Sequence, residues 1–130
     1  MRYLLDANAV IAIMKGNATV LERMKQHRPT DFALPSIVAH ELYYGAYKSA
    51  RQAENIERLA RLQFPVLEFD QEDAIAAGEI RAKLALSGQP IGAYDILIAG
   101  QALNRKLTLV TRNVREFVRI DGLSFENWET

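Results

Sequence analysis

Five short runs of apolar and β-favouring residues divide the chain at intervals and predict strands. They cover residues 2–6, 32–34, 66–69, 108–111 and 123–125. The longer segments between them carry apolar residues at helical spacing and predict helices over residues 9–14, 18–26, 36–48, 52–62, 71–86 and 95–104. Short strands that alternate with helices are typical of a parallel sheet with helices on both faces. The pattern therefore predicts an α/β fold.

Two of the predicted strands end in polar residues of chemical interest. Asp6 closes the first run, directly after Leu4 and Leu5, and the segment LTLVTRN carries Thr111 and Asn113 past the end of another. Ligands of open parallel sheets bind beyond the carboxyl ends of the strands, where the strand order reverses. We therefore expect these polar side chains at one edge of the sheet.

Composition is typical of a folded protein and predicts a single domain over residues 1–130. The chain is 49% hydrophobic and 25% charged, within the ordinary range for globular proteins. No apolar run reaches the roughly 18 residues of a membrane helix, and no basic segment followed by a long apolar one stands at the N-terminus. We therefore expect a cytoplasmic protein that has no membrane segment.

The charge and cysteine counts exclude several kinds of site. With no cysteine, disulfides, thiolate metal sites and cysteine nucleophiles are excluded. A formal net charge of +0 argues against an overall basic surface that would bind polyanions, but it is compatible with a local basic patch. Most basic residues of the C-terminal half are expected on solvated helix faces. The candidates for a patch among them are Arg81, Lys83, Arg105, Lys106, Arg112, Arg115 and Arg119.

Two further carboxylates lie beside apolar segments. Glu41 in PSIVAHELYYGAYK follows Ser36, a good helix cap, and has Ile37 and Val38 one turn before it. Asp95 in IGAYDILIAGQAL opens a nearly apolar segment, typical of a central helix. Each has a structural alternative: Glu41 as a tolerated residue on an amphipathic helix, and Asp95 as an N-cap.

Three acids beside core-forming segments together indicate one shared site. Crowded carboxylates repel one another and would protonate or disperse unless a cation neutralised them. An all-oxygen cluster favours Mg²⁺ or Mn²⁺ over zinc or copper. Such an ion can activate water and stabilise charge on a phosphoryl group, so phosphodiester hydrolysis is the expected chemistry of Asp6, Glu41 and Asp95.

The sequence lacks residues that three other functional motifs require. HELYY begins like the zinc-protease motif H-E-x-x-H, but Tyr44 stands where the second His is required. No serine lies in G-x-S-x-G. GQPIG lacks the length and the Lys-Ser/Thr pair of a phosphate-binding loop and is interpreted as a turn.

The order and spacing of LLDANAVIA, SIVAHELYYGA, PIGAYDILIAGQAL and LTLVTRNVREF resemble the PIN-domain ribonucleases, specifically the VapC toxins of bacterial toxin–antitoxin pairs. The resemblance covers essentially the whole chain. It implies a three-layer α/β/α fold with a short, mainly parallel central sheet. It also implies an Mg²⁺- or Mn²⁺-dependent endoribonuclease that cuts structured RNA, either a tRNA anticodon region or a ribosomal RNA loop.

By matching position, the resemblance assigns Asp6, Glu41 and Asp95 to the metal site and places Asn113 at the family's fourth position. An amide there adds no charge but could bind a metal-bound water. Ala7 departs from the Thr or Ser that usually follows the first Asp.

Five more residues are candidates around this site. Asn8 and Thr111 could orient the carboxylates, with helix capping as the alternative for Asn8. Arg81 and Arg112 are candidates for contacts with RNA phosphate or an antitoxin, or for a solvated face. Glu116 is expected mainly as an ion-pair or capping residue, and a metal role is the alternative.

The resemblance also implies partners. We expect a VapB-type antitoxin whose C-terminal segment crosses the active site, a homodimer, a larger hetero-oligomer with the antitoxin, and DNA contact only through the antitoxin. Two alternatives stay open. One is a PIN-like module that has lost catalysis and only binds RNA or a partner. The other is a signalling receiver domain phosphorylated on Asp70, although Glu41 and Asp95 have no role in that scheme.

Overall fold

The computed structural model describes residues 1–130 as seven α-helices, five short strands and a 3₁₀ turn at Pro29–Asp31. The strands are β1 (Tyr3–Leu5), β2 (Phe32–Pro35), β3 (Val66–Leu67), β4 (Thr108–Val110) and β5 (Phe125–Glu126). The helices are α1 (Ala7–Met14), α2 (Ala18–Met24), α3 (Ser36–Lys48), α4 (Gln52–Ala60), α5 (Gln71–Leu86), α6 (Ala93–Arg105) and α7 (Val114–Phe117). None of these helices combines the length and apolar character needed to cross a bilayer.

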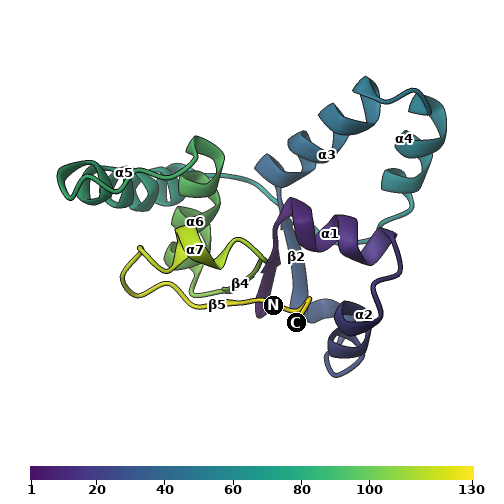
Figure 1. Cartoon of the computed structure of the whole chain (residues 1–130), viewed down its shortest axis with the longest axis horizontal. Coiled ribbons are helices and arrows are strands. Elements are labelled where there is room, and N and C mark those ends of the chain that lie inside the picture. Colours follow the sequence, from purple (N-terminus) through teal and green to yellow (C-terminus); the bar gives the residue numbers. More distant parts are fainter.

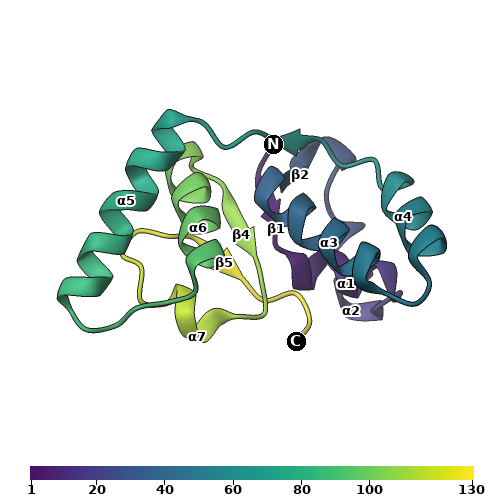
Figure 2. The same ribbon diagram turned by 90° about the horizontal axis from the view of Figure 1, so that it is seen from above.

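The strands form one sheet in the order β3-β2-β1-β4-β5, and every neighbouring pair is parallel. The predicted α/β class with a parallel sheet is confirmed. In two perpendicular views, α1 to α4 lie on one side of the molecule and α5 to α7 on the other (Figures 1 and 2). From β1 the chain builds outward to β2 and β3, and it later returns to the other flank of β1 with β4. The strand order therefore reverses between β1 and β4.

The central strand is apolar because both of its faces are covered. Leu4 and Leu5 of β1 are completely buried, as expected for a parallel strand between helical layers. Trp128 packs against the first residue of the same strand, since its ring meets Tyr3 edge-on at 4.9 Å and stacks on His27 at 5.5 Å. The C-terminal segment is thus packed onto the first strand.

Helices α5 and α6 approach closely because α6 has no side chain at Gly100. A Cβ atom built there would lie 2.6 Å from the Cβ of Ala77 and 2.7 Å from its Cα and backbone N. These distances are far below van der Waals contact, so glycine is required for this crossing.

We expect Gly100→Ala to lower the free energy of unfolding by about 1–3 kcal/mol, because the added methyl must push two helix backbones apart. Urea denaturation would measure the loss. Gly78→Ala is the matched control, since a Cβ at this helical site in α5 meets nothing within 4 Å. It should stabilise the protein by about 0.5–1 kcal/mol. Equal midpoints for the two variants would contradict the packing described here.

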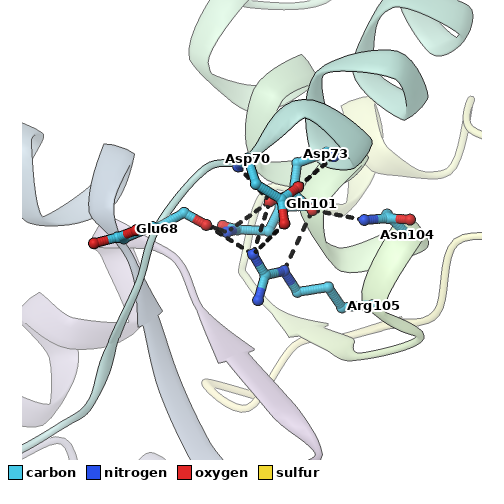
Figure 3. A network of polar contacts seen from close by, with 6 residues as sticks. All are labelled: Glu68, Asp70, Asp73, Gln101, Asn104 and Arg105. Atoms are coloured by element: carbon cyan, nitrogen blue, oxygen red, sulfur yellow. Dashed lines mark hydrogen bonds and ion pairs between the residues drawn. The ribbon is translucent and has the colours of Figure 1, made fainter.

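The N-terminus of α5 is fixed to α6 through Asp73, which is completely buried (Figure 3). Its carboxylate accepts hydrogen bonds from Asn104 Nδ2 at 2.9 Å, from Arg105 Nη2 at 3.0 Å and from Gln101 Nε2 at 3.3 Å. It also accepts the backbone N–H of Asp70 at 3.0 Å and forms a capping box with that residue. The Asp73 carboxylate therefore caps the N-terminus of α5 and also binds side chains of α6.

The same donors also bind the segment between β3 and α5. Arg105 Nη2 donates to the carbonyl of Glu68 at 2.8 Å, and Gln101 Nε2 donates to the same carbonyl at 2.9 Å (Figure 3). The buried Oε1 of Gln101 has no protein partner. Arg105, one of the candidates for a basic patch, is therefore committed to the interior packing of α5 and α6.

Candidate active site

Asp6 and Thr111 lie side by side where the strand order reverses. Leu5 of β1 is paired with Val110 of β4, and the backbone N–H of Asp6 donates to the carbonyl of Val110 at 3.2 Å. The next residue of each strand therefore emerges at the carboxyl edge of the sheet. This is where ligands of open parallel sheets bind, and the sequence placed Asp6 and Thr111 there.

Asp6 is a nearly buried carboxylate, with only 6% of its surface exposed. It serves as the N-cap of α1, since its Oδ1 accepts the backbone N–H of Ala9 at 2.8 Å. Burial raises the pKa of Asp6, while hydrogen bonding to Thr111 and Ala9 opposes the rise. Ionisation of Asp6 therefore costs free energy because the carboxyl is buried, and the hydrogen bonds with Thr111 and Ala9 offset part of this cost.

Glu41 reaches the same edge from α3. Its side chain is half-buried, and its pKa is raised, first by burial and then by the negative charge of Asp6. The neighbouring His40 opposes that rise. The electrostatic effect of Asp6 shows that the two predicted carboxylates face a common space.

Asp95 comes from the first turn of α6 and carries the largest perturbation. Burial, then the hydrogen bond and charge of Glu116, and then the charges of Asp6 and Glu41 raise the pKa of Asp95 to about 7. The same hydrogen bond lowers the pKa of Glu116. Asp95 is therefore the carboxyl that retains a proton near neutral pH, and Glu116 is its ionised partner.

Asn113 joins this pair of acids to β4. Its Nδ2 donates to Asp95 Oδ2 at 3.0 Å and to Glu116 Oε2 at 3.0 Å, and its backbone N–H donates to the hydroxyl of Thr111 at 2.9 Å. Thr111 is buried. Both residues thus act as positioning residues for the carboxylates, Thr111 on Asp6 and Asn113 on Asp95.

Three sequence-based interpretations of helix ends are wrong. The N-cap of α6 is Gly92, so Asp95 lies inside the first turn and capping does not explain it. The N-cap of α3 is Pro35, and Ser36 is the first helical residue. Asn8 lies within α1 and does not cap it, because Asp6 already does. In each case extended backbone carries the chain directly from a strand or turn into the helix.

The carboxylates share a space but do not form a ready-made metal site. No three acidic or histidine side chains converge closely enough to enclose a cation as they stand, because Asp95 is engaged with Glu116 and Asn113. Their chemistry nevertheless fits a hard cation. The donors are oxygens, and the pKa of each carboxyl is raised first by burial and then by a neighbouring negative charge, which a bound cation would offset.

The basic candidates are dispersed. Arg112 is exposed, lies 3.9 Å from Glu129 and opposes the rise in the pKa of Asp6. Arg81 is exposed on α5 and borders an apolar hollow beside Ala93 at the start of α6. Lys83 pairs with Glu79 at 2.9 Å. Of these, only Arg112 lies within electrostatic reach of the carboxylates.

A groove of about 410 Å³ begins at Glu41 and runs between α1, α3 and α4. Its walls include Ala7, Asn8, Ile11 and Leu42. Asn8 and Ala7, which the sequence placed near the metal site, thus line this groove. The groove is mainly apolar and connects directly with the carboxylate edge.

Two features at this edge were not predicted from the sequence. Glu129 near the C-terminus raises the pKa of Asp6 by its charge, although nothing local in the sequence links the two. His40 and Tyr94, each one residue before a site acid, place their rings 5.6 Å apart. Only their adjacency to Glu41 and Asp95 could have indicated them.

Comparisons with known proteins agree with this arrangement. The PIN domain family model matches residues 3–123. The chain is 38% identical over 132 residues to the tRNA(fMet)-specific endonuclease VapC of Salmonella typhimurium, with 98% of each chain covered. It is 38% identical over 133 residues to ribonuclease VapC2 of Haemophilus influenzae, again with 98% of each covered. The structure of VapBC2 from Rickettsia felis bound to a promoter DNA fragment superposes with a TM-score of 0.91 at 34% identity, covering 98% of this chain and 99% of that one.

Proposed function

The chain belongs to the PIN-domain family as a VapC-type ribonuclease toxin, and from this premise we propose that it is a metal-dependent endoribonuclease that cuts structured RNA. The observation that supports the proposal is the group formed by Asp6, Glu41 and Asp95 at the carboxyl edge of the sheet. Burial raises the pKa of each, and the charge of Asp6 adds to the rise at Glu41 and Asp95. Such perturbed carboxylates are typical of catalytic sites.

In this mechanism Asp6, Glu41 and Asp95 would hold Mg²⁺, with Mn²⁺ as a substitute. The bound ion would lower the pKa of water and neutralise charge on the phosphodiester. Thr111 keeps Asp6 oriented, and Asn113 keeps Asp95 and Glu116 together. Without a bound ion, Asp95 shares a proton with Glu116 near neutral pH, and a cation held by Asp95 would displace that proton.

We propose the anticodon region of tRNA as the substrate class, because the relative from Salmonella typhimurium carries the name of a tRNA(fMet)-specific endonuclease. A ribosomal RNA loop is the second candidate. A protein with a net charge of +0 binds RNA through local contacts, so its affinity should fall as salt is added. Such a substrate also places its action in the cytoplasm.

The test is incubation of the purified protein with total bacterial RNA and with initiator tRNA at low salt, followed by sequencing of new 5′ ends. We expect discrete cleavage with Mg²⁺ or Mn²⁺, and none when EDTA is present, because the three carboxylates need the ion to act. Cleavage that persists in EDTA would contradict the proposal. RNA binding without cleavage at any metal concentration would instead support the catalytically impaired module.

The antitoxin can be tested in the same assay. The relative from Rickettsia felis was solved as a VapBC2 complex on promoter DNA, and we propose that a VapB-type partner fills the groove that begins at Glu41. A partner there would suppress cleavage, and light scattering would report a homodimer of the toxin alone and a larger hetero-oligomer with the antitoxin. DNA binding is expected only of the complex.

A further inference from the structure

An aromatic pair connects the same two helices that carry Glu41 and Asp95. The imidazole of His40 on α3 and the ring of Tyr94 on α6 lie 5.6 Å apart, with their planes at 69°. Each ring belongs to the residue immediately before a site carboxylate, and the charge of His40 acts on Glu41. The pair therefore flanks the gap in which a phosphodiester would be bound.

The pair is exposed although it lies beside a partly buried site. His40 is exposed, and Tyr94 keeps 49% of its surface in contact with solvent. Neither side chain makes a hydrogen bond within the protein. In a tilted arrangement the edge of one ring meets the face of the other, so ring faces remain free to accept a flat ligand.

The charges around the pair restrict what can bind. The site itself is acidic, since it holds Asp6, Glu41 and Asp95 with Glu116 beside Asp95, so an acidic ligand without a cation would be repelled. An RNA nucleotide matches both parts of this surface. Its phosphate is compensated by the cation, while its uncharged base stacks on an aromatic face without regard to sequence.

We propose that His40 and Tyr94 form a stacking platform for an unpaired base next to the scissile phosphate, so that the enzyme selects single-stranded loop nucleotides over paired ones. The inference rests on the proposed ribonuclease function and specifies which part of the substrate the chain itself recognises. A base inside a duplex is stacked on its neighbours and presents no free face.

The experiment combines protein variants with modified RNA. The probe is a synthetic anticodon stem-loop of initiator tRNA, or the loop found by 5′-end mapping, in which each nucleotide flanking the cut is made abasic in turn. We expect Tyr94→Ala to lower kcat/KM roughly 10- to 100-fold, and one abasic position to do the same to the wild-type enzyme. Combining the two should cause no further loss, because both remove one contact. Tyr94→Phe keeps the ring face and should retain the activity.

Two controls separate this proposal from its alternatives. Tyr47→Ala removes an exposed ring of α3 two turns beyond His40, about 10 Å along the helix, and should leave kcat/KM unchanged. The stacking proposal is wrong if Tyr94→Ala cleaves RNA like the wild type. It is also wrong if the reduction in kcat/KM caused by Tyr94→Ala multiplies with the reduction caused by every abasic position. A change in molar mass on light scattering for Tyr94→Ala would show instead that the pair serves contact with a second copy.

Failure here is distinguishable from failure of the ribonuclease function. If the wild-type protein cleaves RNA in Mg²⁺, the proposed function stands whatever Tyr94 does. Should Tyr94→Ala fail to fold, the abasic series with wild-type protein still tests the contact from the RNA side. An abasic series with no sensitive position would then overturn the inference.

Discussion

Asp95→Asn is expected to lower the rate of RNA cleavage on the order of 100-fold or more, the scale seen when one charge-stabilising group is removed from an active site. The substitution takes away one of the three carboxylates that would hold the cation. The measurement is single-turnover cleavage of the mapped RNA in saturating Mg²⁺. Asp121→Asn, which makes the same change at an exposed acid away from the site, is the control and should cleave at the wild-type rate.

The same substitution should stabilise the metal-free fold. In the folded protein the pKa of Asp95 is raised from 3.8 to about 7, so the ionised group destabilises the folded state increasingly as the pH rises from 3.8 to about 7, and fully above it. The amide of Asn removes that charge and can still donate to Glu116. Thermal denaturation in EDTA should therefore show a higher midpoint for the variant at pH 8 and nearly equal midpoints near pH 4. A variant that is inactive and less stable at pH 8 would mean that Asp95 supports the fold.

Asp73→Ala is expected to lower the free energy of unfolding by about 3 kcal/mol, the scale of breaking a buried charge pair. The substitution leaves Arg105, Asn104 and Gln101 without their common acceptor and removes the capping box with Asp70. Urea denaturation at pH 7 would measure the loss. Glu79→Ala, which breaks an exposed pair with Lys83 on the same helix, is the control and should leave the urea midpoint nearly unchanged, because solvent screens exposed ion pairs.

The cost of Asp73→Ala should depend on pH. Burial alone would raise the pKa of Asp73, but hydrogen bonds from Arg105, Asn104 and Asp70 outweigh it and lower the pKa below 3.8. A lowered folded-state pKa means that the carboxylate stabilises the fold above the unfolded value and loses this contribution as the pH falls through the folded one. The difference between wild type and variant should thus be largest at neutral pH and shrink below about pH 4. A difference independent of pH would indicate lost packing instead of lost charge.

Local signals in the sequence were sufficient for most of the fold. The predicted helices over 36–48 and 71–86 match α3 and α5 at both ends. The ends of α5 are marked locally, since Asp70 caps its first turn and Gly88, with a positive φ, follows its last. All five predicted strands overlap observed ones. The structure shortens β1, β3 and β4, extends β2 by one residue to Pro35, and places β5 later, at Phe125–Glu126. The helix α7 was missed because four residues are too few to show a period, and the 3₁₀ turn for the same reason.

The parts of the site that end predicted strands could be predicted, whereas the parts that depend on tertiary packing could not. Asp6 and Thr111 could be placed together because each ends a predicted strand of one parallel sheet. The influence of Glu129 on Asp6 could not be predicted, since it depends on how the last residues return past β4. The pairing of the half-buried Arg105 with the buried Asp73 also could not be predicted, because a basic residue near a helix end looks the same in the sequence whether it is solvated or paired.

Helix α6 carries a site carboxylate at its first turn and a structural ion pair at its last turn. Its first turn carries Asp95, and its last turn carries Arg105, bound to Asp73 and Glu68 (Figure 3). Between them Ile98 to Ala102 are fully buried against the sheet and α5. A segment packed in this way opens only with the whole molecule, so its amides belong to the slowest-exchanging part of the chain. The groove wall formed by α4, where only Leu59 is buried, can open locally while the helix that carries Asp95 stays closed.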